Sequence, residues 1–556
     1  MTTGAVVLAE MLEAYEVSHV FHVPAALRRT MVEIETRTGI KRIRPHGEKP
    51  AAYMADGYAR ASGRPGICMA QVIGALNLAA GLRDAYLAHS PVIAMTGGRD
   101  PNTKFRKVYQ ELDDVPAFDH ITKFNATIDS VQRFPDMVRQ AFRAATTGSP
   151  GPVHLQLRGN EGQIDLEEAE MDGLVETRFS RVPPFRPRPD DQAVRDALAY
   201  IEAAERPVLV AGGGVRTSGA GPTLVELAER LGIPVATSLN GKDSIPGTHP
   251  LSVGVVGSYA RAAANRVVGA ADLVVYVGSE TGGMTTHFWQ VPPLGTPCIQ
   301  IDIDPEAIGR NYPPLVGINA DAQVSLARMH ELADGDSATR RAPWIAYVTA
   351  TRQSWYDEYR PLMSSEESPI RPERLCADLT ELVPDDGIVV VDTGHAGMWM
   401  GGFYDLRSRN QSYLRSAGHL GWAFPASLGA KCGAPERPVV CFTGDSGFWY
   451  HVGDIETAVR FGINTVTVVN NNHSGNQSMR GFDRAYGGVQ TERAKELWVF
   501  TEVNFARMAE DIGALGIRVE RPSEFAPAVE RALAAGRPVV IDVVTDIEAV
   551  APVAVV

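Results

Sequence analysis

Short hydrophobic runs alternate with segments of helical periodicity in three successive stretches of the chain. In the first stretch, strands are predicted for the runs VSHVFHVP, IKRIRP, GICMAQVI, SPVIAMTG and PVHLQLR. The segment KPAAYMADGYARASG between them predicts an amphipathic helix, and the N-terminal MTTGAVVLAEMLEAYEV predicts another. Such alternation is typical of βα units, whose strands form parallel sheets covered by helices. The pattern therefore predicts an α/β fold of doubly wound parallel sheets.

The same alternation returns twice further along the chain. Strands are predicted in the middle stretch for ERPVLVAGGGV, GIPVATS, ADLVVYVGS and TPCIQIDID, and in the last stretch from DGIVVVDTG to PVVIDVVTD. The proline-rich segment SRVPPFRPRPDDQ between the first two stretches offers little to bury and predicts an exposed linker. We expect three domains, at residues 1–165, 190–335 and 365–556, because 556 residues exceed what one hydrophobic core usually organises.

Composition narrows the class of protein. The net charge of −13 disfavours a nucleic-acid partner. No uninterrupted apolar stretch approaches the roughly 20 residues of a membrane helix, and the N-terminus lacks a signal-peptide pattern. The five cysteines are scattered without C-x-x-C pairs, which indicates reduced thiols and predicts a cytoplasmic protein without membrane association.

The strongest candidate site lies in the third stretch. The run PVVCF leads into Thr443-Gly444-Asp445-Ser446-Gly447, a helical segment follows, and the run TVTVV ends in Asn470-Asn471-Asn472. Neighbouring parallel strands place their carboxyl ends side by side, so oxygen atoms of Asp445 and Asn472 can converge on one hard divalent cation. The small residues around Asp445 allow backbone amides to approach a phosphate. A helix-capping aspartate followed later by an asparagine turn is the alternative for either motif alone.

This spacing resembles the G-D-G to N-N diphosphate motif of thiamine diphosphate-dependent enzymes, with Ser446 in place of the usual glycine. The resemblance implies that Mg²⁺ is bound by Asp445, Asn472 and the carbonyl of Ser474. It further implies that Gly444, Ser446 and Gly447 lie along the diphosphate. Thiamine diphosphate and Mg²⁺ are therefore the expected cofactors.

Glu48 supplies a second match to the same family. It stands in PHGEKPAAYMADGYAR, at the end of a predicted strand and the start of an alanine-rich helix. Thiamine chemistry requires a carboxylic acid bound to a nitrogen of the cofactor's aminopyrimidine, and Glu48 resembles this activating glutamate, whose helix ends in the same G-Y-A-R. Taken alone, Glu48 is an ordinary first-turn helix glutamate. The two motifs in the family's order identify the chain as an acetolactate synthase-like enzyme.

Two further stretches resemble the family's cofactor cradle. In Asp392-Thr393-Gly394-His395, the resemblance places Gly394 and His395 along the diphosphate. In the segment SAGHLGWAFP, it places the carbonyl of Gly418 against the cofactor's amino group. Leu420 then takes the place of the apolar wedge that bends the cofactor, where many relatives have methionine.

The substrate-facing loops depart from the family. Its G-[IV]-P-G-G turn reads His22-Val23-Pro24-Ala25-Ala26, and its G-P-G-A-T-N loop reads VIGALN at residues 72–77. Gln110 matches a glutamine that faces the reacting carbon in acetolactate synthases, although it could equally be a surface residue; Lys123 fits the surrounding pattern. The arginine-rich segment that handles flavin in those enzymes reads Gly278–Gly283 here, so flavin is not predicted. Gly212-Gly213-Gly214 predicts a tight strand-to-helix turn more strongly than a nucleotide site.

The family resemblance implies an enzyme that forms or cleaves a carbon-carbon bond beside a carbonyl. Carboligase, decarboxylase and lyase outcomes remain open, with a 2-hydroxyacyl-CoA lyase or a non-catalytic cofactor-binding homologue as alternatives. Because Glu48 and Asp445 lie in different domains, the family assembles each site between subunits, and a homodimer or homotetramer is implied. Candidate proton shuttles beside the motifs are His22, His46, His419 and His473, and Glu492 is a weaker candidate.

Overall fold

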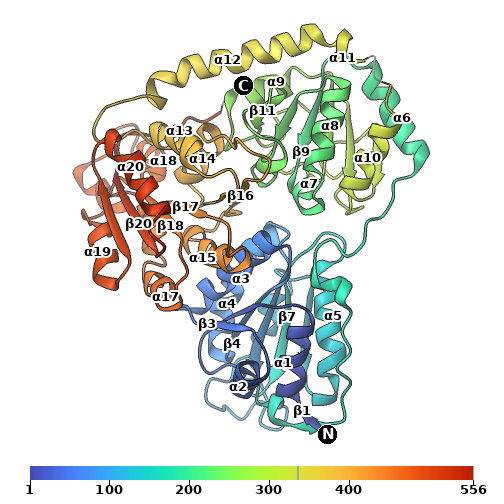
Figure 1. The fold of residues 1–556 in the computed structure, drawn as a ribbon, viewed down its shortest axis with the longest axis vertical. Helices are drawn as coiled ribbons and strands as arrows, with labels where there is room; N and C mark the ends of the chain where they lie inside the picture. The colour runs from blue at the N-terminus through green and yellow to red at the C-terminus, as the bar shows by residue number, and fades with distance from the viewer. Residues whose placement is uncertain (335–336, 555–556) are drawn as a thin grey trace.

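A computed structural model describes residues 1–334 and 337–554 of the chain. Three six-stranded sheets, each entirely parallel, follow one another along the sequence, as shown in Figure 1. Helices cover both faces of each sheet, which confirms the predicted α/β class. A two-stranded antiparallel pair of β1 (Thr2–Thr3) and β8 (Glu168–Ala169) joins the first helix to the end of the first domain.

The N-terminal sheet has the strand order β3-β2-β4-β5-β7-β6. Its strands are β2 (His19–His22), β3 (Lys41–Ile43), β4 (Gly66–Ala70), β5 (Val92–Gly98), β6 (Phe124–Ile128) and β7 (Val153–Arg158). Its helices are α1 (Gly4–Ala14), α2 (Arg28–Arg37), α3 (Glu48–Ser62), α4 (Ala75–Leu87) and α5 (Phe134–Thr146). The apolar faces of α1, α2 and α5 form a core on one side of the sheet, and those of α3 and α4 form the other.

The middle sheet has the order β11-β10-β9-β12-β13-β14, the strand order of dinucleotide-binding folds. Its strands are β9 (Pro207–Ala211), β10 (Val235–Thr237), β11 (Ser252–Val255), β12 (Leu273–Val277), β13 (Cys298–Asp302) and β14 (Val316–Asn319). Its helices are α6 (Asp191–Ala203), α7 (Gly213–Ser218), α8 (Gly221–Leu231), α9 (Ala262–Gly269) and α10 (Ala322–Leu332). After the short α11 (Ser337–Arg340), the long α12 (Ala342–Met363) crosses from this domain to the next (Figure 1).

The C-terminal sheet has the order β16-β15-β17-β18-β20-β19. Its strands are β15 (Ile388–Val391), β16 (Ser412–Arg415), β17 (Val439–Gly444), β18 (Val466–Asn471), β19 (Leu515–Val519) and β20 (Val539–Val544). Its helices are α13 (Pro372–Leu382), α14 (His395–Phe403), α15 (Ala423–Gly433), α16 (Asp445–Trp449), α17 (Asp454–Phe461), α18 (Met479–Ala485), α19 (Phe505–Ile512) and α20 (Pro522–Leu533). Counted from its own first strand, this sheet has the same order as the N-terminal one.

Every strand predicted from a hydrophobic run is present, but five strands of the six-stranded sheets were not predicted: β6, β11, β14, β16 and β19. All five are edge strands. An edge strand pairs on one side only, and three of these five are only partly buried, so their sequences lack a continuous apolar run. The segment 181–190 forms neither helix nor strand, whereas Asp191 and Gln192 of the predicted linker already belong to α6.

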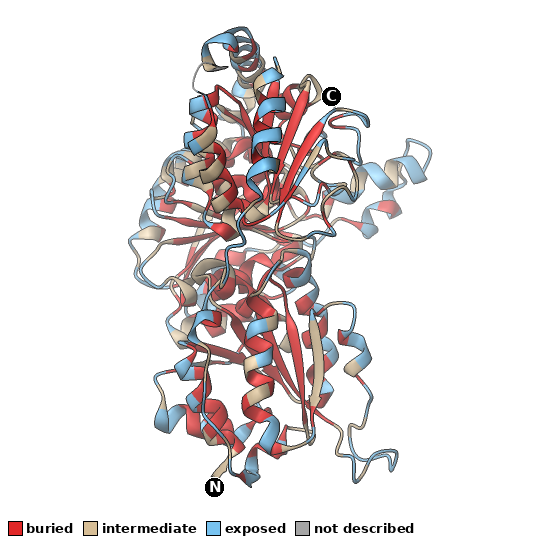
Figure 2. Ribbon diagram, turned by 90° about the vertical axis from the view of Figure 1, so that its right-hand side faces the viewer, coloured by how far each residue is buried: buried red, intermediate tan, exposed pale blue. Residues whose placement is uncertain are grey.

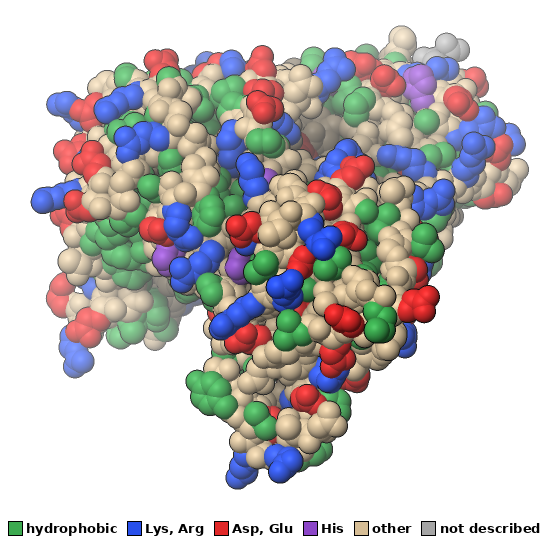
Figure 3. Space-filling model, turned by 60° about the horizontal axis from the view of Figure 1, so that its bottom comes forward, with side chains coloured by type: hydrophobic (Ala, Val, Ile, Leu, Met, Phe, Trp, Pro, Cys, Tyr) green, Lys and Arg blue, Asp and Glu red, His purple; other side chains and the backbone are tan. Residues whose placement is uncertain are grey.

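Figure 2 shows buried strands inside each domain and exposed residues on the outward faces of the surrounding helices. The face seen in Figure 3 mixes Lys and Arg with Asp and Glu side chains, with no broad area of either sign. Within the described residues, no helix is long and apolar enough to cross a membrane.

Helices α3 and α15 cross in close contact and join the N-terminal domain to the C-terminal one (Figure 1). Gly57 of α3 faces the backbone of Ala426, and Gly429 of α15 faces the backbone of Met54. A Cβ atom at Gly57 would lie 1.9 Å from the Ala426 carbonyl oxygen, which no side-chain rotation relieves. Both helices contribute to one buried core, so the two domains are packed as a unit.

We expect Gly57→Ala to destabilise the protein. Alanine favours a helix over glycine by about 1 kcal/mol, but here the methyl group forces α3 and α15 apart, at a cost of about 1–3 kcal/mol or more. Thermal unfolding followed by circular dichroism should show a lower midpoint than the unmodified protein. Gly173→Ala is the control, because a Cβ there meets nothing within 4 Å. Equal midpoints for the two variants would contradict the close crossing.

Candidate functional site

The predicted cofactor residues of the C-terminal domain gather at the carboxyl edge of its sheet. Strands β15 and β17 are neighbours, and the chain leaves them in opposite directions, toward β16 and toward β18. Such a switch point leaves a crevice between the two following loops, where doubly wound sheets bind ligands. Gly394 follows β15, Asp445 follows β17, and Asn472 follows β18.

Asp445, Asn472 and Ser474 form one hydrogen-bonded cluster at this edge. The backbone N–H of Ser474 donates to Asp445 Oδ2 (2.9 Å) and to Asn472 Oδ1 (3.1 Å). The Ser474 hydroxyl donates to Asn472 Oδ1 at 3.0 Å. The backbone N–H of Ser446 holds the other carboxylate oxygen of Asp445 at 2.7 Å. Two loops that are 27 residues apart in sequence therefore converge, as their position after neighbouring strands predicts.

Burial raises the pKa of Asp445 to about 7, although backbone amides of Ser446 and Ser474 oppose the shift. A carboxylate buried at this depth favours a nearby cation. No group of three or more His, Cys, Asp or Glu side chains within residues 1–334 and 337–554 is arranged to hold a metal. The donors here are instead carboxylate, amide and carbonyl oxygens, few in number, a set that suits Mg²⁺ shared with a diphosphate.

Gly394 and His395 form the turn into α14 on the other side of the crevice. Gly394 has a φ of 69°, a left-handed conformation that glycine adopts without strain. The side-chain NH₂ of Asn476 donates to the carbonyls of Ile547 and Ala549, so its oxygen accepts from His395 Nδ1 at 2.8 Å. Because Nδ1 carries the proton, Nε2 of a neutral His395 is the free acceptor.

Asp392 holds the loop that contains Gly418 and Leu420 in place. The carboxylate of Asp392 accepts from the backbone N–H of Gly421 (3.1 Å) and from the Thr443 hydroxyl (3.2 Å). Burial raises the pKa of Asp392 to about 6. Gly418 is exposed and has a φ of 141°, so its backbone is free of side-chain cover. Asp392 thus ties this loop to β15 and β17, a role that sequence reasoning did not assign to it.

A buried charged cluster holds the same loop from the N-terminal domain. Asp84 of α4 accepts from the backbone N–H groups of Ala417 (2.9 Å) and His419 (3.2 Å) and from the Ser416 hydroxyl (3.1 Å). Arg60 of α3 donates to Asp84 at 3.0 Å.

Arg60 connects this carboxylate to the helix crossing. It also donates to Asp56 and, at 2.6 Å, to the carbonyl of Arg415, and its guanidinium lies 4.5 Å from the Trp422 ring centre. Gly57 and Arg60 belong to the G-Y-A-R segment, so this signature serves interdomain contact. The role of Asp84 had no sequence signal.

Tyr53 makes a further interdomain contact that was not predicted. Its hydroxyl lies 2.5 Å from Nδ1 of His419, and its ring meets the rings of His419 and His451 edge-on. Burial raises the pKa of Tyr53 far above its ordinary range, so its hydroxyl stays protonated and donates. His419 is therefore held next to Gly418 with its proton on Nε2.

Glu48 begins α3 in the N-terminal domain and is half-buried. Its carboxylate accepts from the side chain of Asn77 at 3.3 Å. A Cβ atom at Gly74 would lie 2.5 Å from Glu48 Oε1, so any other residue at this position would displace the Glu48 side chain. Gly74, Ala75 and Asn77 are the three positions at which the rebuilt 72–77 loop still matches the family motif. Among the described residues, no hydrogen bond or ion pair links Glu48 to Asp445 or Asn472.

Gln110 lies in the loop between β5 and β6 of the N-terminal domain. It is half-buried, has a φ of 64°, and follows Tyr109, whose carbonyl accepts from the Asn160 side chain at 2.9 Å. Lys123 instead donates to the carbonyl of Thr147, a structural contact away from any motif.

The other candidate proton shuttles lie in different surroundings. Nδ1 of His22 is buried without a partner among the described residues, and burial lowers the pKa of His22 to about 4. His46 pairs with Glu456 at 2.7 Å, and His473 lies 3.9 Å from Glu502. Glu492 is 91% exposed, which fits a solvated carboxylate.

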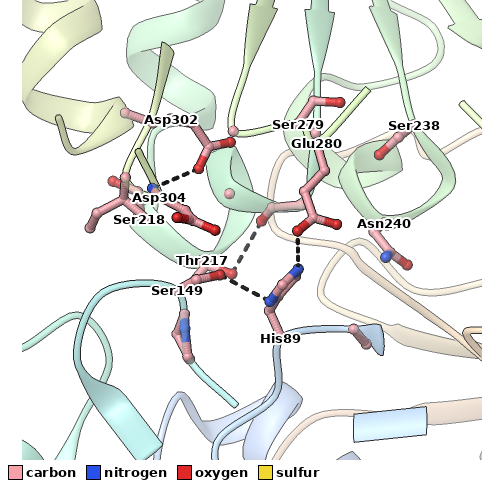
Figure 4. Close-up of a pocket in the computed structure, with 18 of the residues that line it drawn as sticks. His89, Ser149, Thr217, Ser218, Ser238, Asn240, Ser279, Glu280, Asp302 and Asp304 are labelled. Atoms are coloured by element: carbon pink, nitrogen blue, oxygen red, sulfur yellow. Dashed lines mark hydrogen bonds and ion pairs between the residues drawn. The ribbon is translucent and has the colours of Figure 1, made fainter. Parts of the chain in front are cut away.

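A cavity of about 350 Å³ lies between the middle domain and the other two. In Figure 4, Glu280 of the middle domain points toward His89 of the N-terminal domain, at 3.3 Å. Asp302 and Asp304 lie on another wall, and the Ser149 hydroxyl lies 2.9 Å from Nδ1 of His89. The cavity opens at the switch point of β9 and β12, as in dinucleotide-binding folds.

The glycines of this cavity have a packing role. A Cβ atom at Gly212 would lie 2.0 Å from the carbonyl oxygen of Gly278, and one at Gly214 would lie 2.7 Å from its Cα. The predicted tight turn after β9 is confirmed, and the same three glycines line the cavity.

Comparison with known families matches all three domains. Residues 2–117 match the thiamine pyrophosphate enzyme N-terminal TPP binding domain. Residues 194–329 match the central domain of these enzymes, and residues 392–543 match their C-terminal TPP binding domain.

Comparison with curated proteins finds relatives over nearly the whole chain. The chain is 31% identical to a Methanocaldococcus jannaschii protein named "Probable acetolactate synthase large subunit", over 98% of this chain and 92% of that protein. It is 27% identical to the acetolactate synthase large subunit of Lactococcus lactis, over 94% and 89% of the two chains. The corresponding Corynebacterium glutamicum protein is 29% identical, over 97% and 86%.

We expect Asp84→Asn to lower the free energy of unfolding by about 3 kcal/mol, because Arg60 loses a buried partner. The backbone of the 416–421 loop should also become more mobile. Urea unfolding measures the stability, and hydrogen exchange measures faster exchange at the amides of Ala417 and His419. Asp385→Asn is the matched control, since that carboxylate is 76% exposed. Unchanged exchange at Ala417 and His419 in Asp84→Asn would show that Asp84 does not hold the loop.

Proposed function

The chain belongs to the thiamine pyrophosphate enzyme family and is an acetolactate synthase-like enzyme, and from this premise we propose that it is a Mg²⁺-dependent carboligase acting on 2-oxo acids. The cluster of Asp445, Asn472 and Ser474 carries the Mg²⁺ part of the proposal. Oxygen atoms of residues that follow two adjacent strands lie together at one buried position, and the Asp445 carboxylate among them is shielded from water.

The proposed diphosphate site fits these surroundings. Gly394 and Gly444 each precede the first residue of a helix, so backbone N–H groups at both helix starts are available to phosphate oxygens. Ser446 and Gly447 continue the second helix start: Gly447 adds a further amide, whereas the Ser446 amide donates to Asp445 and its hydroxyl is proposed to contact the diphosphate. Nε2 of His395 can donate a hydrogen bond to a phosphate oxygen only after it takes up a proton, so we expect the charge of His395 to follow diphosphate binding.

When bound, thiamine diphosphate supplies an acidic ring carbon that becomes a nucleophile and then accepts the electron pair of the broken bond. The Glu48 carboxyl group is proposed to hold a ring nitrogen of the aminopyrimidine, with Asn77 fixing its orientation and Gly74 leaving it room. The exposed carbonyl of Gly418 is proposed to accept from the amino group. Leu420 is proposed to support the bent form through van der Waals contact. Gln110 is proposed to face the reacting carbon.

A homodimer or homotetramer with sites between subunits is part of the proposal. Glu48 contacts Gly74 and Asn77 of its own domain, not the Asp445 cluster of its own chain. Large hydrophobic side chains are exposed near Glu48 and near the Asp445 cluster. Ile73, close to Glu48, is 52% exposed, and Tyr450, which follows helix α16, is 56% exposed. Such exposed groups mark surfaces that a second copy covers.

A 2-hydroxyacyl-CoA lyase is the second candidate, favoured by the cavity of the middle domain. Asp302 is the last residue of β13 and Asp304 lies just after it; both line the cavity, where carboxylates can accept hydrogen bonds from ribose hydroxyl groups. Decarboxylase and lyase outcomes share the first steps with carboligation. A non-catalytic homologue is disfavoured, because it would have no chemical reason to retain the buried Asp445 cluster and the space at Gly74 for Glu48.

We expect thiamine diphosphate to bind in calorimetric titrations only when Mg²⁺ is present. Asp445→Ala should weaken this binding about 100-fold, because the buried cation loses its only carboxylate. Glu48→Gln should retain binding but lose turnover of 2-oxo acids by about 100-fold or more, because an amide cannot supply the acid proton. Glu492→Gln is the matched control and should behave like the unmodified protein. Metal-independent binding, or full turnover in Glu48→Gln, would contradict the proposed roles.

Mixing the two defective chains tests the site between subunits. If Glu48 of one chain serves the Asp445 cluster of another, a dimer of Glu48→Gln and Asp445→Ala chains contains one intact site. Random reassociation in equal amounts should restore about a quarter of the activity, since half of the dimers are mixed and each has one working site of two. The separate variants, treated identically, are the controls. Activity no higher than theirs would place both residues in a site within one chain.

A further inference from the structure

The loop from Arg99 to Leu112 carries a group of unpaired cations beside the proposed reaction site. Lys104, Arg106 and Lys107 are exposed, and none of them forms an ion pair within the described part of the chain. The chain as a whole is acidic, with a net charge of −13. Three like charges within four residues repel one another, and an anion between them removes this repulsion.

Within the described part of the chain, the acidic residues in and next to this loop form no ion pair with these three cations. Both carboxylate oxygens of Glu111 accept from backbone N–H groups, those of Phe105 (2.6 Å) and Val108 (3.2 Å). Asp113 pairs with Arg99 at 2.7 Å. Asp100 caps the backbone N–H of Asn102 at 2.9 Å. These contacts shape the loop and leave its positive side chains outward.

The backbone of the loop is held in an unusual conformation. Phe105, Lys107 and Gln110 have φ angles of 67°, 54° and 64°, a left-handed region that non-glycine residues rarely adopt. Strain of this kind concentrates at binding and catalytic loops, where the surrounding contacts maintain it. Glu111 maintains it here from within the loop, through the backbone N–H groups of Phe105 and Val108.

Hydrogen bonds connect this loop to the neighbourhood of Glu48. The side chain of Asn160 donates to the carbonyl of Tyr109 at 2.9 Å, and the carbonyl of Asn160 accepts from the backbone N–H of Val72 at 2.9 Å. Val72 begins the turn that ends at Gly74, against which Glu48 lies. The cations and Gln110 therefore belong to the same rim as the proposed activating carboxyl group.

We propose that Lys104, Arg106 and Lys107 recognise a second anionic group on the substrate, distal to the reacting carbonyl. This inference rests on the proposed function and narrows its substrate class to acids with an anionic tail, of carboxylate, sulfonate or phosphonate type. Gln110 faces the reacting carbon, and the cations three to six residues before it meet the tail. The exposed rings of Phe105 (82%) and Tyr109 (79%) offer apolar contact to the carbon chain between the two ends.

Binding of unreactive probes tests the inference without requiring turnover. The holoenzyme, loaded with thiamine diphosphate and Mg²⁺, is titrated at low ionic strength with glutarate and with valerate, which match in length but differ in the second carboxylate. Glutarate should bind more tightly. The triple variant Lys104→Gln, Arg106→Gln, Lys107→Gln should lose about tenfold in glutarate affinity and little in valerate affinity, because it removes only the charge on the loop.

A matched variant controls for the change in net charge. Lys41→Gln, Arg409→Gln, Arg531→Gln removes three exposed cations that also lack ion pairs in the described structure but lie on other elements. It should retain the glutarate preference. Equal affinity of the intact holoenzyme for both probes, or a preference that survives in the loop variant, would overturn the inference.

Turnover separates this inference from the proposed function. 2-Oxoglutarate should be used with a higher kcat/KM than 2-oxopentanoate, and the loop variant should raise KM for the former while leaving kcat nearly unchanged. If neither acid is turned over while the glutarate preference depends on the loop, the proposed reaction fails and the anion site stands. Turnover with no preference between the two acids counts against the anion site alone.

Discussion

The buried contact between Arg60 and its two carboxylates is the interaction on which the rest of the arrangement depends. Three charges leave water together, which is favourable only when each keeps its partners. Besides pairing with Arg60, Asp84 accepts hydrogen bonds from backbone amides of the 416–421 loop. The position of this proposed cofactor loop is therefore set by a helix of another domain. The close crossing at Gly57 brings the helices near enough for these bonds to form.

One helix consequently serves two purposes. Helix α3 begins with Glu48, the proposed activating acid, and within the next turns it presents Tyr53 to His419 and Arg60 to the loop beneath. A displacement of α3 would move the acid and the loop together. In the proposed dimer these belong to different sites, because Glu48 serves the partner while the loop serves its own chain. The two sites are then mechanically joined through a single rigid element, with no need for a mobile linker.

Much of this could be predicted from the sequence, for reasons that differ between parts of the molecule. Buried central strands such as β17 and β18 consist of uninterrupted apolar runs, so their positions could be predicted. Edge strands such as β6 were not predicted, because one side of the strand is solvated and its sequence lacks such a run. Asp445 and Asn472 were predicted to converge because their strands are neighbours, and Ser474 indeed bonds both. The roles of Asp84 and Asp392 could not be predicted, since both carboxylates hold the loop through its backbone amides, and such bonds leave no pattern in the sequence.

The departures from the family fall where backbone geometry tolerates them. Ala25 stands in a turn where the resembled motif has glycine, yet it keeps a φ of 74°, at a cost of about 1–2 kcal/mol. Gly74, by contrast, cannot change while Glu48 occupies its place, and Gly57 cannot change while α3 and α15 cross. Gly57 is thus limited by contact with backbone and Gly74 by contact with the Glu48 side chain, whereas Lys104 and Arg106 on the substrate rim are exposed. Substrate preference can therefore shift without disturbing the proposed chemistry.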